Sequence, residues 1–362
     1  MAERIVPPYA NRGVQNTSEN GLRACVDWVQ VTFKNVDSPK DVIDLLGLDF
    51  DDFLEFDAGK YGFDSHLRFG HIAIYYNSIP KAQNYIHLEV TGQGCREFEQ
   101  FSKYDWVTML GLFLMLDVNI TRFDIAIDDF RGYFTFKQLI NKIKKGHVRS
   151  RFKKARILED VKLEDGSTVG TTIYFGSPKS DIQIRIYDKY QERISNGFEI
   201  VEGVDKWIRT EIQMRDKRAI TAVYELVNNI YSVGVEVQRI LRNYVLFVDP
   251  DKNDSNKARW KVSRFWEKFL NGVEPLKLTQ VAPDMTVQKV KNWFEHSVSA
   301  NFAMLLEAFE YDENLLREWV EQGKKKFQKK HENMLTRFRK EREFLEYQYE
   351  QKKRIFDVQR FQ

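Results

Sequence analysis

Four segments of the chain alternate apolar residues with residues that can perform chemistry: 85–91, 120–129, 181–189 and 206–213. Because successive side chains of a β-strand point to opposite faces, each segment predicts a strand with one apolar and one functional face. If these strands share a sheet with their apolar faces aligned, the other face gathers a tyrosine, carboxylates and arginines. The residues concerned are His87, Glu89, Asp124, Asp128, Arg185, Tyr187, Lys189, Arg209 and Glu211.

This set of side chains predicts metal-assisted attack on a phosphodiester by a tyrosine. A tyrosine is a poor nucleophile at its ordinary pKa of about 10, but a cation stabilises the phenolate and a divalent ion polarises the phosphodiester. Attack by Tyr187 would leave DNA joined to the tyrosine through its 5′-phosphate and release a 3′-hydroxyl, while Arg185 and Lys189 bind phosphate. The candidate ligands are Asp124, Asp128, Glu211 and Glu89, whose carboxylate oxygens suit Mg²⁺ or Mn²⁺ rather than zinc.

Two other interpretations fit the same alternation. One is an antiparallel sheet without catalysis, whose second face either lies in water, as is ordinary, or only contacts phosphates in a non-catalytic DNA-binding protein. The other is a two-metal nuclease that uses water, in which Tyr187 is only structural. The abundance of short acids, arginine and tyrosine favours a functional face, because clustered carboxylates repel unless a cation or arginine offsets them. The chain has no GxxxxGK[ST] motif, so no P-loop ATPase activity is expected.

The charge of the chain is divided unevenly along its length. Residues 1–130 contain 11 Lys and Arg against 20 Asp and Glu, whereas residues 131–362 contain 45 against 33. The stretch 131–156 has ten basic residues, no acidic residue and interleaved aromatics, which suits a phosphate backbone with bases that can stack. The predicted DNA-binding residues in this stretch are Arg131, Lys142, Lys144, Lys145, Arg149, Arg151, Lys153 and Lys154.

Strands interspersed with helices and hairpins predict an α+β fold, with a largely antiparallel sheet and flanking helices, followed by a helical C-terminal region. We predict an N-terminal arm over residues 1–23, a catalytic nicking domain over 24–218, a helical region over 219–312 and an extended charged helix over 313–362. Residues 95–116 have helical spacing, the basic stretch is helix-like, and no internal repeat is evident.

The composition places the chain among globular proteins. Of its 362 residues, 43% are hydrophobic and 14% aromatic, which is enough to bury a core. Cys25 and Cys95 are the only cysteines, so we expect no disulfide framework and a reducing compartment. Since no apolar run is long enough to cross a bilayer, we expect a cytoplasmic protein that makes no contact with a membrane.

Three runs carry a resemblance to a known family: TRFDIAIDDF (121–130), TTIYFGSPKSDIQIRIYDKYQE (171–192) and WIRTEIQMRDKRA (207–219). Together they resemble the Rep-trans family of rolling-circle replication initiators, which includes the MobT- and NicK-type relaxases of integrative and conjugative elements. The resemblance extends over roughly residues 25–300, and the most specific part is YxGSxxSxxxxRxYDKxxE, from Tyr174 to Glu192.

The resemblance implies a cytoplasmic DNA strand-transferase that nicks one strand at an origin through a tyrosine, needs a divalent cation and works with a host helicase. It places the nucleophile at Tyr187, with Tyr190 and Tyr174 as the alternatives. The implied acidic positions are Asp124, Asp128 and Glu211, with Glu89 and Glu192 as further candidates. The length of the chain favours the relaxase of a mobile element over a plasmid or phage replication initiator, and the family analogy permits a homodimer.

Overall fold

The computed structural model describes residues 21–34, 36–78, 85–116, 118–198, 200, 203–228, 233–273, 287, 290–291, 294, 298–329 and 331–340. The chain forms two compact units. The first combines residues 1–192 with 201–283, and the second combines residues 193–200 with 284–362. The predicted N-terminal arm lies almost wholly outside the described residues, and the predicted boundaries near residues 23, 218 and 312 stay a prediction.

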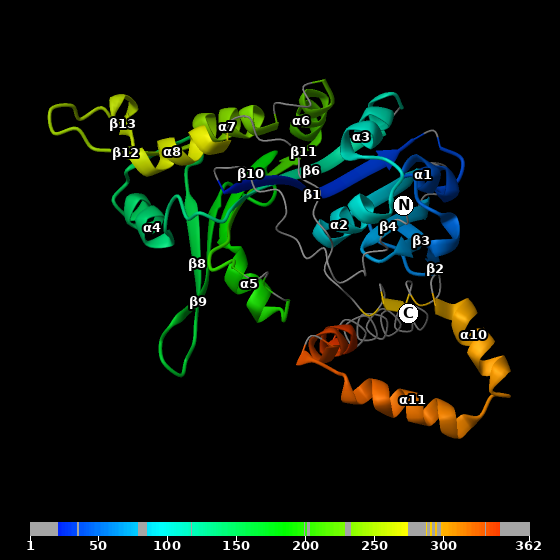
Figure 1. Ribbon diagram of the computed structural model, residues 1–362. Helices are drawn as coiled ribbons and strands as arrows, with labels where there is room; N and C mark the ends of the chain where they lie inside the picture. The colour runs from blue at the N-terminus through cyan, green and yellow to red at the C-terminus, as the bar shows by residue number, and fades with distance from the viewer. Residues whose placement is uncertain are drawn as a thin grey trace, which may run out of the picture. The chain divides into compact units, whose positions relative to one another are not determined.

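A ten-stranded sheet forms the frame of the first unit (Figure 1). All its neighbouring strands are antiparallel, in the order β2-β3-β4-β5-β1-β6-β11-β10-β9-β8. The α+β fold with a largely antiparallel sheet is therefore confirmed. The strands are β1 (Leu22–Phe33), β2 (Leu54–Phe56), β3 (Phe63–Phe69), β4 (Ile72–Ser78), β5 (Ile86–Val90), β6 (Val118–Asp129), β8 (Ala155–Val161), β9 (Thr168–Phe175), β10 (Ile182–Asp188) and β11 (Ile208–Arg215).

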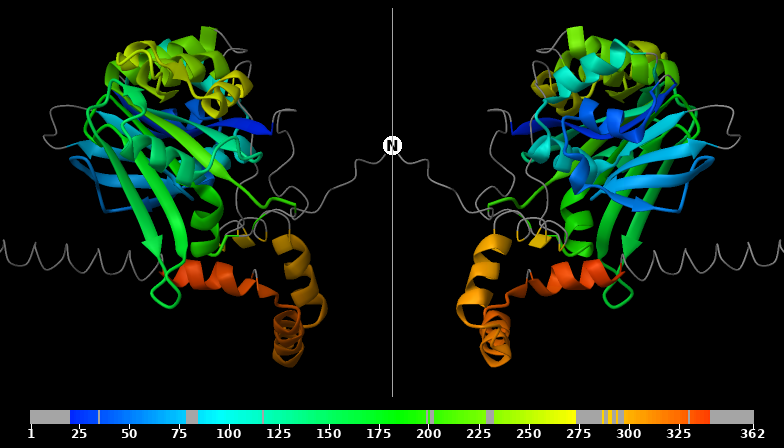
Figure 2. Two further views of the ribbon diagram at one scale, coloured as in Figure 1. Left: turned by 90° about the vertical axis from the view of Figure 1, so that its left-hand side faces the viewer. Right: turned by 90° about the vertical axis from the view of Figure 1, so that its right-hand side faces the viewer.

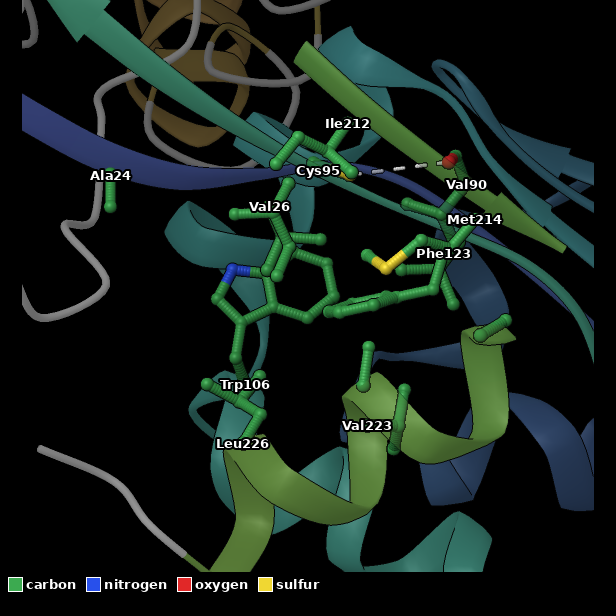
Figure 3. Close-up of a cluster of buried hydrophobic side chains, with 14 of the residues drawn as sticks. Ala24, Val26, Val90, Cys95, Trp106, Phe123, Ile212, Met214, Val223 and Leu226 are labelled. Carbon is green, nitrogen blue, oxygen red and sulfur yellow. Dashed lines mark hydrogen bonds between the residues drawn. The ribbon is translucent and has the colours of Figure 1, made fainter. Parts of the chain in front are cut away.

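Helices cover the apolar face of this sheet, as the views in Figure 2 show. They include α1 (Pro39–Leu45), α2 (Gly92–Phe101), α3 (Trp106–Leu114), α6 (Asp216–Asn228), α7 (Val233–Tyr244) and α8 (Arg264–Val273). Phe123 and Ile212 from the sheet pack with Val223 and Leu226 of α6 in the cluster drawn in Figure 3, where Trp106 of α3 also lies. The apolar halves of the alternating segments thus meet in one core.

The basic stretch 131–156 forms several elements rather than one helix. It contains α4 (Phe136–Lys144), β7 (Val148–Ser150) and the start of β8. The helix begins at a capping box between Thr135 and Gln138, and it stops before Gly146, whose φ of +67° is unfavourable for most residues. Strand β7 then joins a small sheet with β12 (Val245–Asp249) and β13 (Lys261–Val262).

The predicted helix over 95–116 is two helices, α2 and α3. Ser102 ends α2, and Asp105 caps α3 by accepting a hydrogen bond from the backbone N–H of Thr108 at 2.8 Å. The apolar spacing continues across this break, which is why the sequence indicated a single helix. The capping aspartate marks the new start.

The second unit is helical where it is described. It contains α10 (Ser299–Ala308), α11 (Glu313–Lys325) and a helical stretch over residues 331–340. Residues 326–328 lie in no helix, and residues 341–362, part of the predicted extended helix, lie outside the described residues. Among the helices that the structure describes, none is both long and apolar enough to cross a membrane.

Candidate active site

Strand registers place the predicted functional residues on one face of the sheet. Neighbouring strands β1, β6, β11 and β10 align these residues in three rows that run across the sheet. The rows contain Arg23, Asp128, Arg209 and Tyr187; Cys25, Ala126, Glu211 and Arg185; and Trp28, Asp124, Gln213 and Gln183. Tyr187, Arg185, Glu211, Asp124 and Asp128 therefore share one region of one face, whereas Glu89 lies further along the sheet.

Tyr187 sits near the end of β10 with its ring between cationic side chains. The guanidinium carbon of Arg185 lies 4.4 Å from the ring centroid and Lys189 Nζ lies 5.6 Å from it. Only 6% of Tyr187 is exposed, and this burial raises the pKa of its phenol well above the ordinary value, although Arg209 and Arg185 act in the opposite direction. The side chain is a neutral phenol at physiological pH, within reach of cations that would stabilise a phenolate.

Asp128 is fully buried between two arginines. Arg209 donates to its two oxygens at 2.7 and 2.9 Å, and Arg23 donates to Oδ2 at 2.7 and 3.2 Å. Burial alone would raise the pKa of Asp128, but Arg209 and Arg23 outweigh it and hold that pKa well below the usual range. Its carboxylate holds Arg209 and Arg23 in place, and its predicted role as a metal ligand stays a prediction.

Asp124 and Glu211 have the opposite electrostatic behaviour. Each is paired with one arginine: Arg122 Nε lies 2.9 Å from Asp124 Oδ2, and Arg185 Nη2 lies 2.5 Å from Glu211 Oε2. Burial raises the pKa of Asp124 to about 7, and the charges of Glu211 and Asp27 contribute. Burial likewise raises the pKa of Glu211. These carboxylates lie close enough to disfavour each other's charged form.

Asp27 is a functional candidate that the sequence reasoning missed. It is the extra residue of a bulge in β1, between Val26 and Trp28, and its Oδ1 accepts a hydrogen bond from Arg209 Nη1 at 2.7 Å. Burial would raise its pKa, but Arg209, Lys189 and Arg96 together lower it. The only sequence signal was one aspartate within an apolar strand.

Glu89 belongs to a separate hydrogen-bond network. It lies on β5, which β1, β6 and β11 separate from β10. Its carboxylate accepts from Gln30 Nε2 at 2.8 Å, Tyr61 Oη at 2.5 Å and Lys60 Nζ at 3.0 Å. In the described part of the chain, no three His, Cys, Asp or Glu side chains are grouped so that they could hold a metal ion by themselves.

The alternative tyrosines and Glu192 lie on the elements that precede and follow β10 along the chain. Tyr174 on β9 is in register with Arg185 on β10. Tyr190 belongs to α5 (Lys189–Ser195), where its backbone N–H donates to the carbonyl of Trp207 at 3.0 Å. Glu192 pairs with Lys189 at 2.6 Å.

The basic stretch contains both engaged and exposed cations. Lys142 Nζ donates to Asp249 and to the carbonyl of Val248, and Arg149 donates to the carbonyl of Ala258, so both help to fix the small sheet. The other predicted DNA-binding residues are exposed: Arg131, Lys144, Lys145, Arg151, Lys153 and Lys154.

Comparisons with known proteins show which family and which fold the chain is similar to. A family model described as a replication initiation factor matches residues 118–320, and a model for the N-terminal domain of a rolling-circle replication initiation protein matches residues 23–113. The "Putative DNA relaxase NicK" of Bacillus subtilis (strain 168) is 35% identical over 320 residues, covering 86% of this chain and 90% of the relative. The solved rolling-circle replication initiator protein from Geobacillus stearothermophilus is 41% identical with a TM-score of 0.67, covering 72% of this chain and 99% of that one.

The predicted family resemblance is thus confirmed by sequence and by fold. The two matched regions together cover both halves of the ten-stranded sheet. The chain belongs to the replication initiation factor family of rolling-circle initiators and relaxases.

Proposed function

We propose that this chain is a site-specific, metal-dependent DNA nickase that cleaves one strand of an origin with Tyr187. The observation that carries the proposal is the position of the Tyr187 ring between Arg185 and Lys189, in a row with the Asp128–Arg209 pair. Tyr187 Oη bonds to phosphorus, the bond from phosphorus to the 3′-oxygen breaks, the phenolic proton passes to solvent and the 3′-oxygen takes up a proton. The products are a 5′-phosphotyrosine and a free 3′-hydroxyl.

The surrounding residues have distinct roles in this proposal. Arg185 and Lys189 bind the scissile phosphate and stabilise the phenolate. Arg209, held by Asp128 and Asp27, is a positioning residue that supports the row containing Tyr187. Because its partners occupy Arg209 from both sides, its orientation is fixed before DNA binds.

The buried carboxylates fit a divalent cation. Mg²⁺ keeps several waters and is usually held by one or two carboxylates together with substrate phosphates, so a closed cluster of protein ligands is not required. Asp124 and Glu211 supply oxygen ligands whose pKa values are raised by burial and, to a smaller extent, by neighbouring carboxylates, and a cation would offset this concentration of negative charge. When bound there, Mg²⁺ or Mn²⁺ would polarise the phosphodiester.

The exposed cations of residues 131–156 would grip the DNA backbone on either side of the nick. Their proposed role is electrostatic and independent of sequence, so base contacts elsewhere must select the origin. A relaxase for transfer of a mobile element is the preferred biological role, and a plasmid or phage replication initiator would use the same chemistry. A helicase partner and a homodimer remain predictions.

The proposal is tested with supercoiled DNA that carries the region flanking the gene for this chain, incubated with Mg²⁺ or Mn²⁺. The wild type should nick the DNA and form an adduct that resists denaturant, and Tyr187→Phe should form neither product. Tyr174→Phe and Tyr190→Phe serve as matched controls and should retain both activities.

Other outcomes identify the alternatives. Nicking without an adduct, unchanged in Tyr187→Phe, would identify a nuclease that uses water. An adduct that disappears only in Tyr174→Phe or Tyr190→Phe would move the nucleophile to that tyrosine. Specific binding of the flanking DNA with neither product would leave a non-catalytic DNA-binding protein.

A further inference from the structure

The ten-stranded sheet has an internal two-fold symmetry. Its order has the same connectivity from either edge: β1 and β6 are central, and each is followed along the chain by four strands that begin at the outer edge and return inward. The pairing of β1 with β6 is symmetric about Val29 and Phe123. For example, the pair Trp28 and Asp124 is matched by the pair Gln30 and Arg122.

This symmetry assigns an N-terminal counterpart to each active-site position. Following the registers outward from the central pair, β5 corresponds to β11, β4 to β10, β3 to β9 and β2 to β8. The counterparts of Asp124, Glu211, Arg185, Tyr187, Tyr174 and Arg156 are Gln30, His87, Tyr75, Asn77, His66 and Phe56, respectively. The N-terminal half therefore has no tyrosine where Tyr187 stands and neither of the two carboxylates assigned to the metal.

Beside the ion pair of Lys60 and Glu89, the N-terminal half carries a connected set of rings. We call this set the aromatic platform: Phe56, Tyr61, Phe63, His66, Tyr75 and His87. Phe56 stacks on His66 with centroids 5.0 Å apart, and His66 lies 5.2 Å from Tyr75. His87 lies 5.0 Å from Tyr61 and 6.2 Å from Phe63. Tyr61 joins the two groups through its contact with Tyr75 at 5.7 Å.

The aromatic platform is partly open to solvent. Phe56 is 41% exposed and Tyr61 is 52% exposed. Phe56 is in register with His66 on the polar face, and Tyr61, in the loop between β2 and β3, donates a hydrogen bond to Glu89 of that face. An exposed, contiguous group of rings on a sheet face is a surface on which unpaired bases can stack.

The chemistry of the aromatic platform favours a neutral ligand. The His87 side chain is buried among these rings. Thr32 Oγ1 contacts its Nδ1 at 2.9 Å, while its buried Nε2 has no hydrogen-bond partner among the described residues. Lys60, the cation beside the rings, is already paired with Glu89 at 3.0 Å. The charges of Lys60 and Glu89 offset each other beside these rings, and a base offers the rings a flat face and hydrogen-bonding edges.

We propose that the aromatic platform is a non-cleaving subsite that stacks unpaired bases of the strand whose phosphate is held at Tyr187. This inference rests on the proposed nicking function and adds a second point of contact for the same DNA. The C-terminal half of the sheet then binds the phosphate and cleaves the strand. The N-terminal half stacks the bases, a contact that only unpaired bases can make.

Single-stranded oligonucleotides from the flanking DNA, each carrying 2-aminopurine at one position, provide the test. Stacking on the platform should quench 2-aminopurine at a limited set of positions. Phe56→Ala and Tyr61→Ala should restore that fluorescence and weaken binding about 5- to 150-fold, the range expected for losing one stacked base. Both side chains are substantially exposed, so the variants should fold. Tyr224→Ala, which removes a 57% exposed tyrosine on α6, is the matched control and should change neither quantity.

The outcomes separate this subsite from the nicking function. At saturating DNA, Phe56→Ala and Tyr61→Ala should still form the Tyr187 adduct, since neither residue belongs to the nicking centre. Unchanged affinity together with unchanged fluorescence in both variants would overturn the platform even if wild-type nicking is observed. Loss of nicking in Tyr187→Phe with normal quenching would leave the platform supported, because stacking is measured without cleavage.

Discussion

Asp128 has a structural role whose loss should be costly. Its carboxylate accepts from both Arg23 and Arg209, and all three side chains are buried. We predict that Asp128→Asn lowers the free energy of unfolding by about 3–5 kcal/mol, the usual cost of leaving a buried charge without its partner. Urea denaturation at pH 7 measures this loss. Glu236→Gln, which breaks an exposed pair with Arg239, should stay within about 1 kcal/mol of the wild type.

The pH dependence of that difference has a defined sign. The pKa of Asp128 is lowered in the folded protein, so the carboxylate stabilises the fold above the unfolded pKa of about 3.9. The stability gap between wild type and Asp128→Asn should therefore be complete at pH 7 and shrink as the pH falls below about 4. A gap that is constant down to pH 2 would contradict the ion-pair explanation.

Asp124 should respond to metal in a way that can be measured without DNA. We predict that Mg²⁺ or Mn²⁺ stabilises the wild type, by about 2.7 kcal/mol when the ion is at about 100 times its Kd. Asp124→Asn should lose most of this stabilisation, whereas Glu89→Gln should retain it because Glu89 lies in a separate network. Thermal unfolding with and without the ion measures the effect, and equal losses in the two variants would argue against the assignment.

The raised pKa of Asp124 also predicts how this effect changes with pH. In the metal-free protein the unfolded chain ionises at about pH 4 while the folded carboxyl keeps its proton to about pH 7, so this group lowers stability as the pH rises through that interval. Metal binding needs the deprotonated form. The stabilisation by metal should therefore grow between about pH 6 and pH 8, and a flat profile would contradict it.

At the scale of elements, the basic stretch combines residues that build the fold with residues that remain available for DNA. Lys142 and Arg149 are engaged by the small sheet, whereas Lys153 and Lys154 are exposed at the start of the β8–β9 hairpin. We predict that replacing Lys153 and Lys154 together by alanine weakens DNA binding and reduces its salt slope by about 2, one for each lost phosphate contact. Fluorescence anisotropy over a salt series measures this slope.

The control for that experiment is Lys103→Ala, which removes an exposed lysine from the loop between α2 and α3. Its salt slope should match that of the wild type. If Lys103→Ala reduced the slope as much as the double variant, the DNA footprint would not be centred on the basic stretch.

An element could be predicted when the pattern that defines it lies within its own residues, and not when it depends on a partner far away in the sequence. The strands that carry Asp124, Tyr187 and Glu211 were evident from alternation, because the two faces of a strand appear directly in the sequence. The split of the basic stretch depended on Gly146 and on pairing of β7 with β12, a partner about 100 residues away. Such non-local pairing leaves no periodic signal, so composition indicated the DNA-binding character of the stretch but not its elements.

At the scale of the whole molecule, the family and the fold class could be predicted from the sequence. The two-fold symmetry that relates the two halves of the ten-stranded sheet could not. The symmetry of the sheet is expressed in strand order and register, and counterpart positions such as Tyr187 and Asn77 carry different residues. The sequence therefore shows no repeat from which the position of the aromatic platform could be predicted. Contacts with residues distant in the sequence also distinguish two aspartates on the same face of β6. Asp128 is bound by Arg23 and Arg209, whereas Asp124 is paired with Arg122.

The bulge at Asp27 adds one residue to β1 without changing which of its other residues pair with β6. On β1, Arg23 and Cys25 share the polar face with Trp28 and Gln30, so the odd-numbered positions give way to even-numbered ones at the extra residue. The extra residue shifts the alternation of polar and apolar residues along the sequence by one position, while both parts of the strand keep the same two faces. Deleting Asp27 would place Val26 directly before Trp28, so the side chains would alternate regularly and Arg23 would still face Asp128. The deletion would instead remove the carboxylate that binds Arg209 Nη1, so the extra residue adds a functional group to the strand without changing the faces of its neighbours.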